Sequence, residues 1–339
     1  MGFILWGASF LSADSFTRPF SADSVWNRPI PEKAAYENVP SIGKIYGGIN
    51  WNDRWTTFVY KTDAQSRKAR LFIHPPTLWS QRHSEAVAPT GNSDAIEEKL
   101  RAASAPRNGF PANFYSTTVR SPPGKRTFPS AVQAIHTAWR SEIVVPVTPF
   151  SPSPDTDGHL AIWQPDGRVL EVYCAVVCKN GDVIGTMASF TDPSGDGSGL
   201  ANGRCASLIP NFAGLIRRGE VASGSIGHAL ACTFPAALLA CEAVYPAVAF
   251  DMNDGYKGTV PMGSLLALPP STDLSSLNLS PAAMVIARAA QRYGIYVVDR
   301  GGDGLTLKAD QDAADAVTPE IRNDLYKIVR ALKLVHGSR

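Results

Sequence analysis

Acidic, imidazole and phenol side chains alternate in one short segment, SPDTDGHLAIWQPDGRVLEVY. Asp155, Asp157 and His159 occupy every second position, so an extended strand would point all three to one face. Beyond a Pro-Asp-Gly turn, Glu171 and Tyr173 also share a face, and the register of the turn decides whether they meet His159. A carboxyl group beside a second acid or base can carry out proton transfer at a sugar ring.

A purely structural interpretation of the same segment is also open. The two aspartates can be turn residues, His159 a hydrogen-bonded core histidine and Trp163 a packing residue. A second histidine, His228 in GSIGHALAC, also follows a glycine at the start of an apolar strand. It is either another core histidine or a point where a ligand approaches the backbone. We expect His159 and His228 to form one site if their strands are neighbours in one sheet.

Hydrolysis of a polysaccharide would need two carboxyl groups, and the candidates are two of Asp155, Asp157 and Glu171. The distance between the two groups would then decide between retention and inversion at the anomeric carbon. The segment holds more carboxylates than cations, which slightly favours hydrolysis over elimination.

Elimination from a uronic acid would use a different set of residues. His159, His228 or Tyr173 would act as the base, and Arg168 or Lys257 would neutralise the carboxylate of the substrate. The sequence alone leaves both reactions open.

Exposed indole rings are the third functional signal. Trp51 and Trp55 lie in the polar segment NWNDRW, and sugar-binding clefts use large apolar rings flanked by polar groups. Sealing the end of a β-sandwich is the structural alternative. The candidate substrate-binding residues are Trp51, Trp55, Trp163, Arg168, Tyr256 and Lys257.

Three acidic, glycine-rich loops gather oxygen ligands of the kind that calcium prefers: TDPSGDGSG, FDMNDGYKG and DRGGDG. None matches the twelve-residue EF-hand loop, and ordinary turns explain all three. If one loop binds structural calcium, we expect Asp251, Asn253 and Asp254 to be its ligands. No cofactor is required by either reaction. Nucleotide-binding, nucleophile-elbow and zincin motifs are absent from the sequence, and the five cysteines show no zinc-ligand spacing.

The elements that must position these residues are mainly strands. In 339 residues there are 28 glycines and 26 prolines, which favour many turns. Strands are predicted in SEIVVPVTPF, GHLAIWQ, RVLEVYCAVV and DVIGTMASF, joined as antiparallel hairpins of one sheet, and later in GSIGHALACTF, MGSLLALP and IYVVDRGG. Helices are predicted in ASLIPNFAGLIRRGEVASG, LSPAAMVIARAAQRYG and residues 318–335.

These patterns predict a mainly β fold, a jelly-roll-type antiparallel β-sandwich with a few edge helices. We expect one domain over residues 1–339, with a proline-rich surface excursion around residues 80–126. The 32 basic residues balance the 30 acidic ones, so nothing draws the protein to nucleic acid, and no stretch approaches the ~20 apolar residues of a membrane span. The apolar start, MGFILWGASFLSA, lacks the basic residues of a signal peptide and is interpreted as a buried strand or a signal remnant.

Five segments together resemble the ordered blocks of a largely uncharacterised group of secreted bacterial proteins. The blocks are PFSADSVWNRPIP, DGHLAIWQPDGRVLEVY, FAGLIRRGEVASGSIGHALA, PMGSLLALPP and LSPAAMVIARAAQRYGIYVVDRGG, and they cover most of residues 19–302. The resemblance implies an extracellular β-rich protein that acts on polysaccharide, and it assigns no catalytic residue. The start of the chain and the excursion depart from the group, so a virion-associated protein stays open.

The sequence therefore predicts a polysaccharide-cleaving enzyme with a polysaccharide or oligosaccharide partner, in which glycoside hydrolysis is slightly favoured over lyase chemistry. The alternative is a non-catalytic carbohydrate-binding or virion or cell-surface structural protein.

Overall fold

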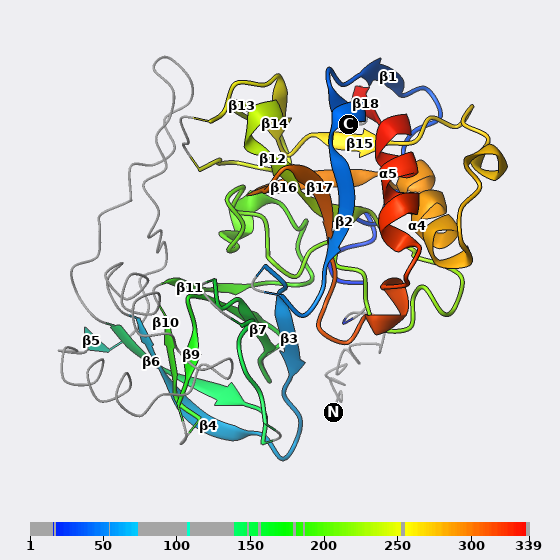
Figure 1. Ribbon diagram of the computed structural model, residues 1–339. Helices are drawn as coiled ribbons and strands as arrows, with labels where there is room; N and C mark the ends of the chain where they lie inside the picture. The colour runs from blue at the N-terminus through cyan, green and yellow to red at the C-terminus, as the bar shows by residue number, and fades with distance from the viewer. Residues whose placement is uncertain are drawn as a thin grey trace, which may run out of the picture.

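The computed structural model describes residues 16, 18–53, 55–73, 107–108, 139–147, 149–154, 157–178, 181–185, 187–251 and 255–336. In this part of the chain strands predominate and form several sheets, which confirms the predicted β-rich fold. Figure 1 shows the smaller sheets on one side of the molecule and the largest sheet, with the helices, on the other.

The largest sheet has seven strands. Their spatial order is β1 (Ala35–Asn38), β18 (Lys333–His336), β15 (Leu265–Ala267), β16 (Ile295–Gly301), β12 (Leu230–Pro235), β17 (Gly304–Lys308) and β2 (Tyr46–Asn50). A separate pair consists of β13 (Leu239–Ala243) and β14 (Val260–Met262).

Two smaller sheets make up the other side. The five-stranded sheet has the order β5 (Arg107–Asn108), β6 (Trp139–Val145), β4 (Arg67–Ile73), β10 (Val183–Gly185) and β9 (Val176–Val177). The four-stranded sheet has the order β11 (Met187–Thr191), β8 (Val169–Tyr173), β7 (Leu160–Trp163) and β3 (Phe58–Lys61).

The four-stranded sheet is buried on both faces, and this explains the nearly continuous apolar sequence of its central strands. Leu160 and Ile162 of β7 belong to the hydrophobic cluster shared with the five-stranded sheet. Ala161 and Trp163 point the other way, into the cluster shared with the seven-stranded sheet. The period-2 alternation of a strand therefore joins the two clusters through one layer.

Strand pairing differs from the purely antiparallel arrangement that we expected. The β7–β8 hairpin and the β8–β11 pair are antiparallel. However, β12 pairs with β16, β17 with β2 and β3 with β7 in parallel. The sheets are mixed because the chain changes sheet between consecutive strands, as it does between β2 and β3. Strand periodicity identifies a strand but does not say which sheet receives it.

The two α-helices of the described residues pack beside the seven-stranded sheet (Figure 1). The helix α4 (Pro281–Arg292) confirms the prediction from Ser280 and Pro281, and the left-handed Gly294 follows its end. The helix α5 (Ile321–Ala331) is shorter than the predicted 318–335. Leu332 is extended, and the residues after it form β18 between β1 and β15.

The helix that we predicted in ASLIPNFAGLIRRGEVASG is wrong, because residues 206–224 form turns and irregular segments with one isolated bridge from Ile216 to Ala309. Leu208 and Gly214 have left-handed backbone angles, with φ of 60° and 61°, which an α-helix does not accommodate. The single-turn 3-10 helices of the described residues lie elsewhere, at Ile42–Lys44, Gly199–Ala201, Ala236–Leu238, Leu274–Leu277 and Ala314–Ala316.

Most of the proline-rich excursion lies outside the described residues. Within the described part of the chain, neither helix is long and apolar enough to cross a membrane.

Candidate functional site

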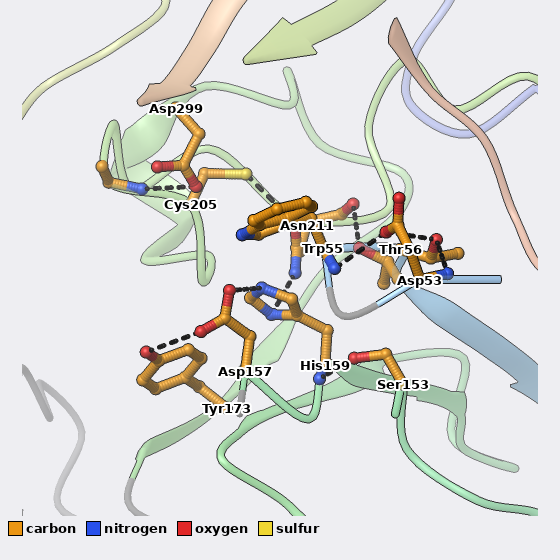
Figure 2. Close-up of polar contacts among 12 residues, drawn as sticks. Asp53, Trp55, Thr56, Ser153, Asp157, His159, Tyr173, Cys205, Asn211 and Asp299 are labelled. Carbon is orange, nitrogen blue, oxygen red and sulfur yellow. Dashed lines mark hydrogen bonds and ion pairs between the residues drawn. The ribbon is translucent and has the colours of Figure 1, made fainter. Parts of the chain in front are cut away.

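The β7–β8 hairpin places the rings of His159 and Tyr173 next to each other. Leu160 pairs with Val172, so the residues one step further out lie opposite each other, with ring centroids 5.3 Å apart. The carboxylate of Asp157 lies between them (Figure 2). Its Oδ1 accepts a hydrogen bond from the Tyr173 hydroxyl at 3.4 Å, and its Oδ2 lies 4.0 Å from His159 Nε2.

Asp157 is the accessible carboxylate of this group. Its side chain is 20% exposed, whereas the side chain of His159 is 9% exposed. Burial, followed by the charge of Asp157, raises the pKa of Tyr173 above the ordinary phenol value. Tyr173 therefore keeps its proton at neutral pH and acts as a donor to Asp157. Asp155 lies outside the described residues.

Glu171 points to the same face as Tyr173 but is fully buried. Its Oε1 accepts a hydrogen bond from Thr191 Oγ1 at 3.0 Å. Its Oε2 accepts the backbone N–H groups of Arg204 at 3.2 Å and Asn211 at 2.5 Å. Burial raises the pKa of this carboxyl. Through these backbone hydrogen bonds Glu171, which lies two residues before Tyr173 on β8, fixes the loop that carries Asn211.

Asn211 connects His159 to a buried lysine. The Nδ2 of Asn211 lies 2.8 Å from His159 Nδ1, and its Oδ1 receives hydrogen bonds from Lys308 Nζ and from the Cys205 thiol, the latter at 3.3 Å. An ammonium group can only donate, so Lys308 fixes Oδ1 as the acceptor and Nδ2 as the donor. Burial raises the pKa of the Cys205 thiol to about 12, so it is also a donor.

This orientation of Asn211 determines the tautomer of His159. Because Asn211 Nδ2 donates, His159 Nδ1 must accept, and the ring proton of the neutral imidazole is on Nε2. The backbone N–H of His159 donates to Ser153 Oγ at 2.8 Å and holds the start of β7. His159 therefore directs an N–H toward Asp157 instead of offering it a free nitrogen.

Asp299, near the end of β16, is a second carboxyl group at the site. Burial and then the charge of Asp251 raise its pKa to about 7. Its Oδ2 accepts the Ala206 N–H at 3.2 Å and its Oδ1 accepts the Arg300 N–H at 2.8 Å. The charge of Asp299 in turn raises the pKa values of Tyr173 and Cys205. Figure 2 shows Asp299 beside Cys205, on the side of the site where Asp157 and Tyr173 lie.

A second group of charges borders Asp299. The Tyr256 hydroxyl donates to Asp251 Oδ1, and Arg300 Nε lies 3.5 Å from Asp251 Oδ2. Burial, followed by the Asp251 charge, raises the pKa of Tyr256. Of the three residues that we expected to bind calcium, Asp251 thus contacts a phenol and a guanidinium, while Asn253 and Asp254 lie outside the described residues.

His228 is in a different place from the one we expected. It precedes β12 of the seven-stranded sheet, whereas His159 precedes β7 of the four-stranded sheet, so the two histidines do not share a sheet. His228 Nδ1 lies 2.8 Å from the Ala229 oxygen and Nε2 lies 3.1 Å from Glu220 Oε1. The contact with Ala229 is local, and the contact with Glu220 ties the segment before β12 to the preceding turn.

The predicted substrate-binding residues are scattered. Trp163 is buried between Phe16 and Phe212, at centroid distances of 4.9 and 4.8 Å. Trp51 donates its indole N–H to the Gln311 carbonyl and packs against the core. Other positions are exposed: Trp55 opens onto solvent, Lys257 is on the surface, and Arg168 pairs with Asp166 at the far end of the β7–β8 hairpin.

Sequence reasoning missed Asn211, Lys308 and Asp299 as site residues. Asp299 and Lys308 each follow a run of strand residues, in IYVVD and LTLK. A charged residue at or near the end of a buried strand is unusual, and this pattern could have marked both as candidate site residues. No local sequence pattern marked Asn211, because its role depends on its contacts with His159, which precedes β7, and with Lys308 of β17. Among the described residues, no group of three or more His, Cys, Asp or Glu side chains could hold a metal ion, and none of the five cysteines is in a disulfide.

Comparison with known proteins found no match: no family model, no curated protein and no solved structure matches the chain.

Proposed function

We propose that the protein is a polysaccharide-cleaving glycoside hydrolase in which Asp299 is the acid and Asp157 is the base or nucleophile. The observation that carries the proposal is the carboxyl group of Asp299, which has a pKa of about 7 and whose charge acts on Tyr173, the hydrogen-bond donor to Asp157. A carboxyl group that is still protonated near neutral pH can give its proton to a leaving group, and glycosidases use such an acid opposite an ionised carboxylate.

The bond changes follow from these roles. Asp299 gives its proton to the glycosidic oxygen as the bond from that oxygen to the anomeric carbon breaks. If Asp157 acts as the base, it takes a proton from a water molecule whose oxygen bonds to the anomeric carbon. If it acts as the nucleophile, its oxygen bonds to that carbon first, and water then replaces it with Asp299 as the base. In both cases the Tyr173 hydroxyl donates to the carboxylate of Asp157, and His159 Nε2 faces this carboxylate at 4.0 Å.

Elimination receives less support from the same contacts. Tyr173 has a raised pKa and keeps its proton, so it is a poor base. The Nδ1 of His159 already accepts from Asn211 and its Nε2 carries the proton. Glu171 is buried and accepts from Thr191 and two backbone N–H groups, so we propose a structural role for it.

A non-catalytic carbohydrate-binding protein is the second candidate, and the exposure of Trp55 favours it. Either function fits the extracellular location that the resemblance implies, and the virion-associated alternative.

Two substitutions test the proposal on a polysaccharide that the parent protein cleaves. Asp299→Asn and Asp157→Asn should each lower kcat/KM by about 10² to 10⁴, the usual contribution of a general acid or base. Asp166→Asn, at the exposed end of the hairpin, is the matched control and should leave kcat/KM unchanged. Parent-like turnover by either site variant would remove that residue from the proposed mechanism.

A further inference from the structure

A cavity of about 310 Å³ opens beside β2, β17 and the start of α5. Its volume is at the lower end of the range of small-ligand pockets. Residues of β2, β12, β16, β17 and α5, and of the Trp55 loop, contribute to its wall. The side chains that give it chemical character are Tyr46, Trp55, Thr233, Thr306, Val317 and Arg322.

Three of its wall residues are apolar or aromatic side chains that the protein leaves in solvent. Tyr46 is 39% exposed, Trp55 is 42% exposed and Val317 is 39% exposed. The described residues include seven large hydrophobic side chains with such exposure, and three of them line this one cavity. A group of exposed aromatic rings in a concave place is typical of a binding site and not of random surface.

The local backbone holds the two rings in position. A Cβ atom at Gly304 would come within 2.5 Å of the Tyr46 ring, so the ring lies directly on bare backbone. On the other side, the side chain of Asp53 accepts hydrogen bonds from the backbone N–H of Trp55 at 2.9 Å and from the Thr56 hydroxyl at 3.1 Å. These bonds fix the turn that carries the indole. The protein itself therefore forms both the surface under the Tyr46 ring and the turn that carries Trp55.

The cavity adjoins the candidate active site. Thr306 of the cavity and Lys308 of the site are two residues apart on β17, and Gly301 and Asp299 are two apart on β16, so each pair shares a face of the sheet. The segment that carries Trp55 also contacts the candidate active site, because Thr57 Oγ1 donates to the backbone carbonyl of Asn211 at 3.2 Å.

The charge of the wall limits the class of ligand. Among the residues that line the cavity, Arg322 is the charged one, and its guanidinium carbon lies 5.7 Å from the centre of the Tyr46 ring. An arginine held over an aromatic ring keeps its N–H groups available for a carboxylate. Two aromatic faces, threonine hydroxyls and one cation match a pyranose ring that carries an acidic group.

We propose that this cavity, the Tyr46–Trp55 pocket, binds a uronic acid unit of a glycan chain next to the site of cleavage. The role as a subsite rests on the proposed function, whereas binding of an acidic sugar does not depend on turnover. The aromatic rings take the face of the sugar, and Arg322 pairs with its carboxylate.

Calorimetric titration tests the pocket with tetrasaccharides of galacturonic, glucuronic and mannuronic acid, and with cellotetraose as the neutral probe. The titrations use Asp299→Asn protein, so that no substrate is consumed and a failure of catalysis cannot imitate a failure of binding. On this background Trp55→Ala should weaken binding of an acidic tetrasaccharide at least tenfold. Arg322→Gln should weaken the same binding about tenfold without lowering the affinity for cellotetraose. Tyr245→Ala removes an exposed aromatic residue outside the pocket and serves as the control.

Each outcome decides the proposal. Binding of an acidic tetrasaccharide that Trp55→Ala and Arg322→Gln weaken, and that Tyr245→Ala does not, supports the pocket even if the parent protein cleaves no glycan. Absence of binding to all four probes overturns it, as does unchanged binding by folded Trp55→Ala protein. Equal loss of acidic and neutral binding in Arg322→Gln overturns the assignment of a uronic acid.

Discussion

Protonation of Asp299 has consequences for stability as well as for chemistry. Its pKa is raised from 3.8 to about 7 in the folded protein, so the folded chain keeps a proton that the unfolded chain has released. The stabilisation is fully present below about pH 4 and is lost as the pH rises toward 7, at about 1.4 kcal/mol per pH unit.

Urea denaturation between pH 5 and 8 measures this effect directly. The parent should lose unfolding free energy relative to Asp299→Asn by about 3 kcal/mol over that interval, most of it below pH 7. The comparison uses the change with pH, because the amide also alters contacts with the Ala206 and Arg300 N–H groups at every pH. Parallel pH curves for the two proteins would show that the pKa of Asp299 is not raised.

Lys308 should act on His159 through Asn211. Replacing Lys308 by Met removes the donor that fixes Asn211 Oδ1, so the amide can turn over and His159 can take the other tautomer. In protein with ¹⁵N-labelled histidine, the His159 Nδ1 and Nε2 shifts should move toward each other, and kcat/KM should fall about tenfold to a hundredfold. Lys257→Met is the exposed control. A parent spectrum that places the ring proton of His159 on Nδ1 would contradict the proposed effect of Lys308 on His159 through Asn211.

Some residues of the candidate site could be predicted from the sequence, and others could not. Asp157, His159 and Tyr173 come from one hairpin, where period-2 alternation and turn register suffice to bring them together. Asn211 reaches His159 from a segment more than fifty residues away, and Lys308 reaches Asn211 from a strand of another sheet, so only the three-dimensional packing joins them.

At the scale of elements, the loop around Asn211 depends on one buried carboxylate. Glu171→Ala would leave the Arg204 and Asn211 N–H groups without acceptors, which should cost about 3 kcal/mol of unfolding free energy. Glu171→Gln can keep both bonds with its oxygen and donate its NH₂ to Thr191, so it should stay folded and active. Thermal melts and turnover assays check both variants. Loss of turnover in well-folded Glu171→Gln would instead make Glu171 a catalytic carboxylate.

Strand and helix prediction succeeded where the pattern was local. The helix after Ser280 has its cap position, Pro281 and closing Gly294 in the sequence, and it forms as predicted. The segment of residues 206–224 has a helical apolar pattern, but the Asn211 N–H binds Glu171 and Gly214 is left-handed. Tertiary hydrogen bonds therefore outweigh the local preference there.

At the scale of the whole molecule, the site lies where two hydrophobic clusters meet. The four-stranded sheet buries one face in each cluster. Asn211 joins His159, which precedes a strand of that sheet, to Lys308 of the seven-stranded sheet. Asp157 comes from the smaller side, and Asp299 and Lys308 come from the larger side. A site assembled in this way explains why composition and periodicity predicted a β-rich fold but not the residues that face each other.

Product analysis on a panel of neutral and acidic polysaccharides tests the central claim most directly. New reducing ends would be measured together with the absorbance of unsaturated uronates, for the parent and for Asp157→Asn. Hydrolysis predicts reducing ends without that absorbance, on a glycan that contains uronic acid, and their loss in the variant. Absorbance in step with reducing ends would indicate elimination, and a folded parent that leaves the whole panel intact would contradict a glycan-cleaving function.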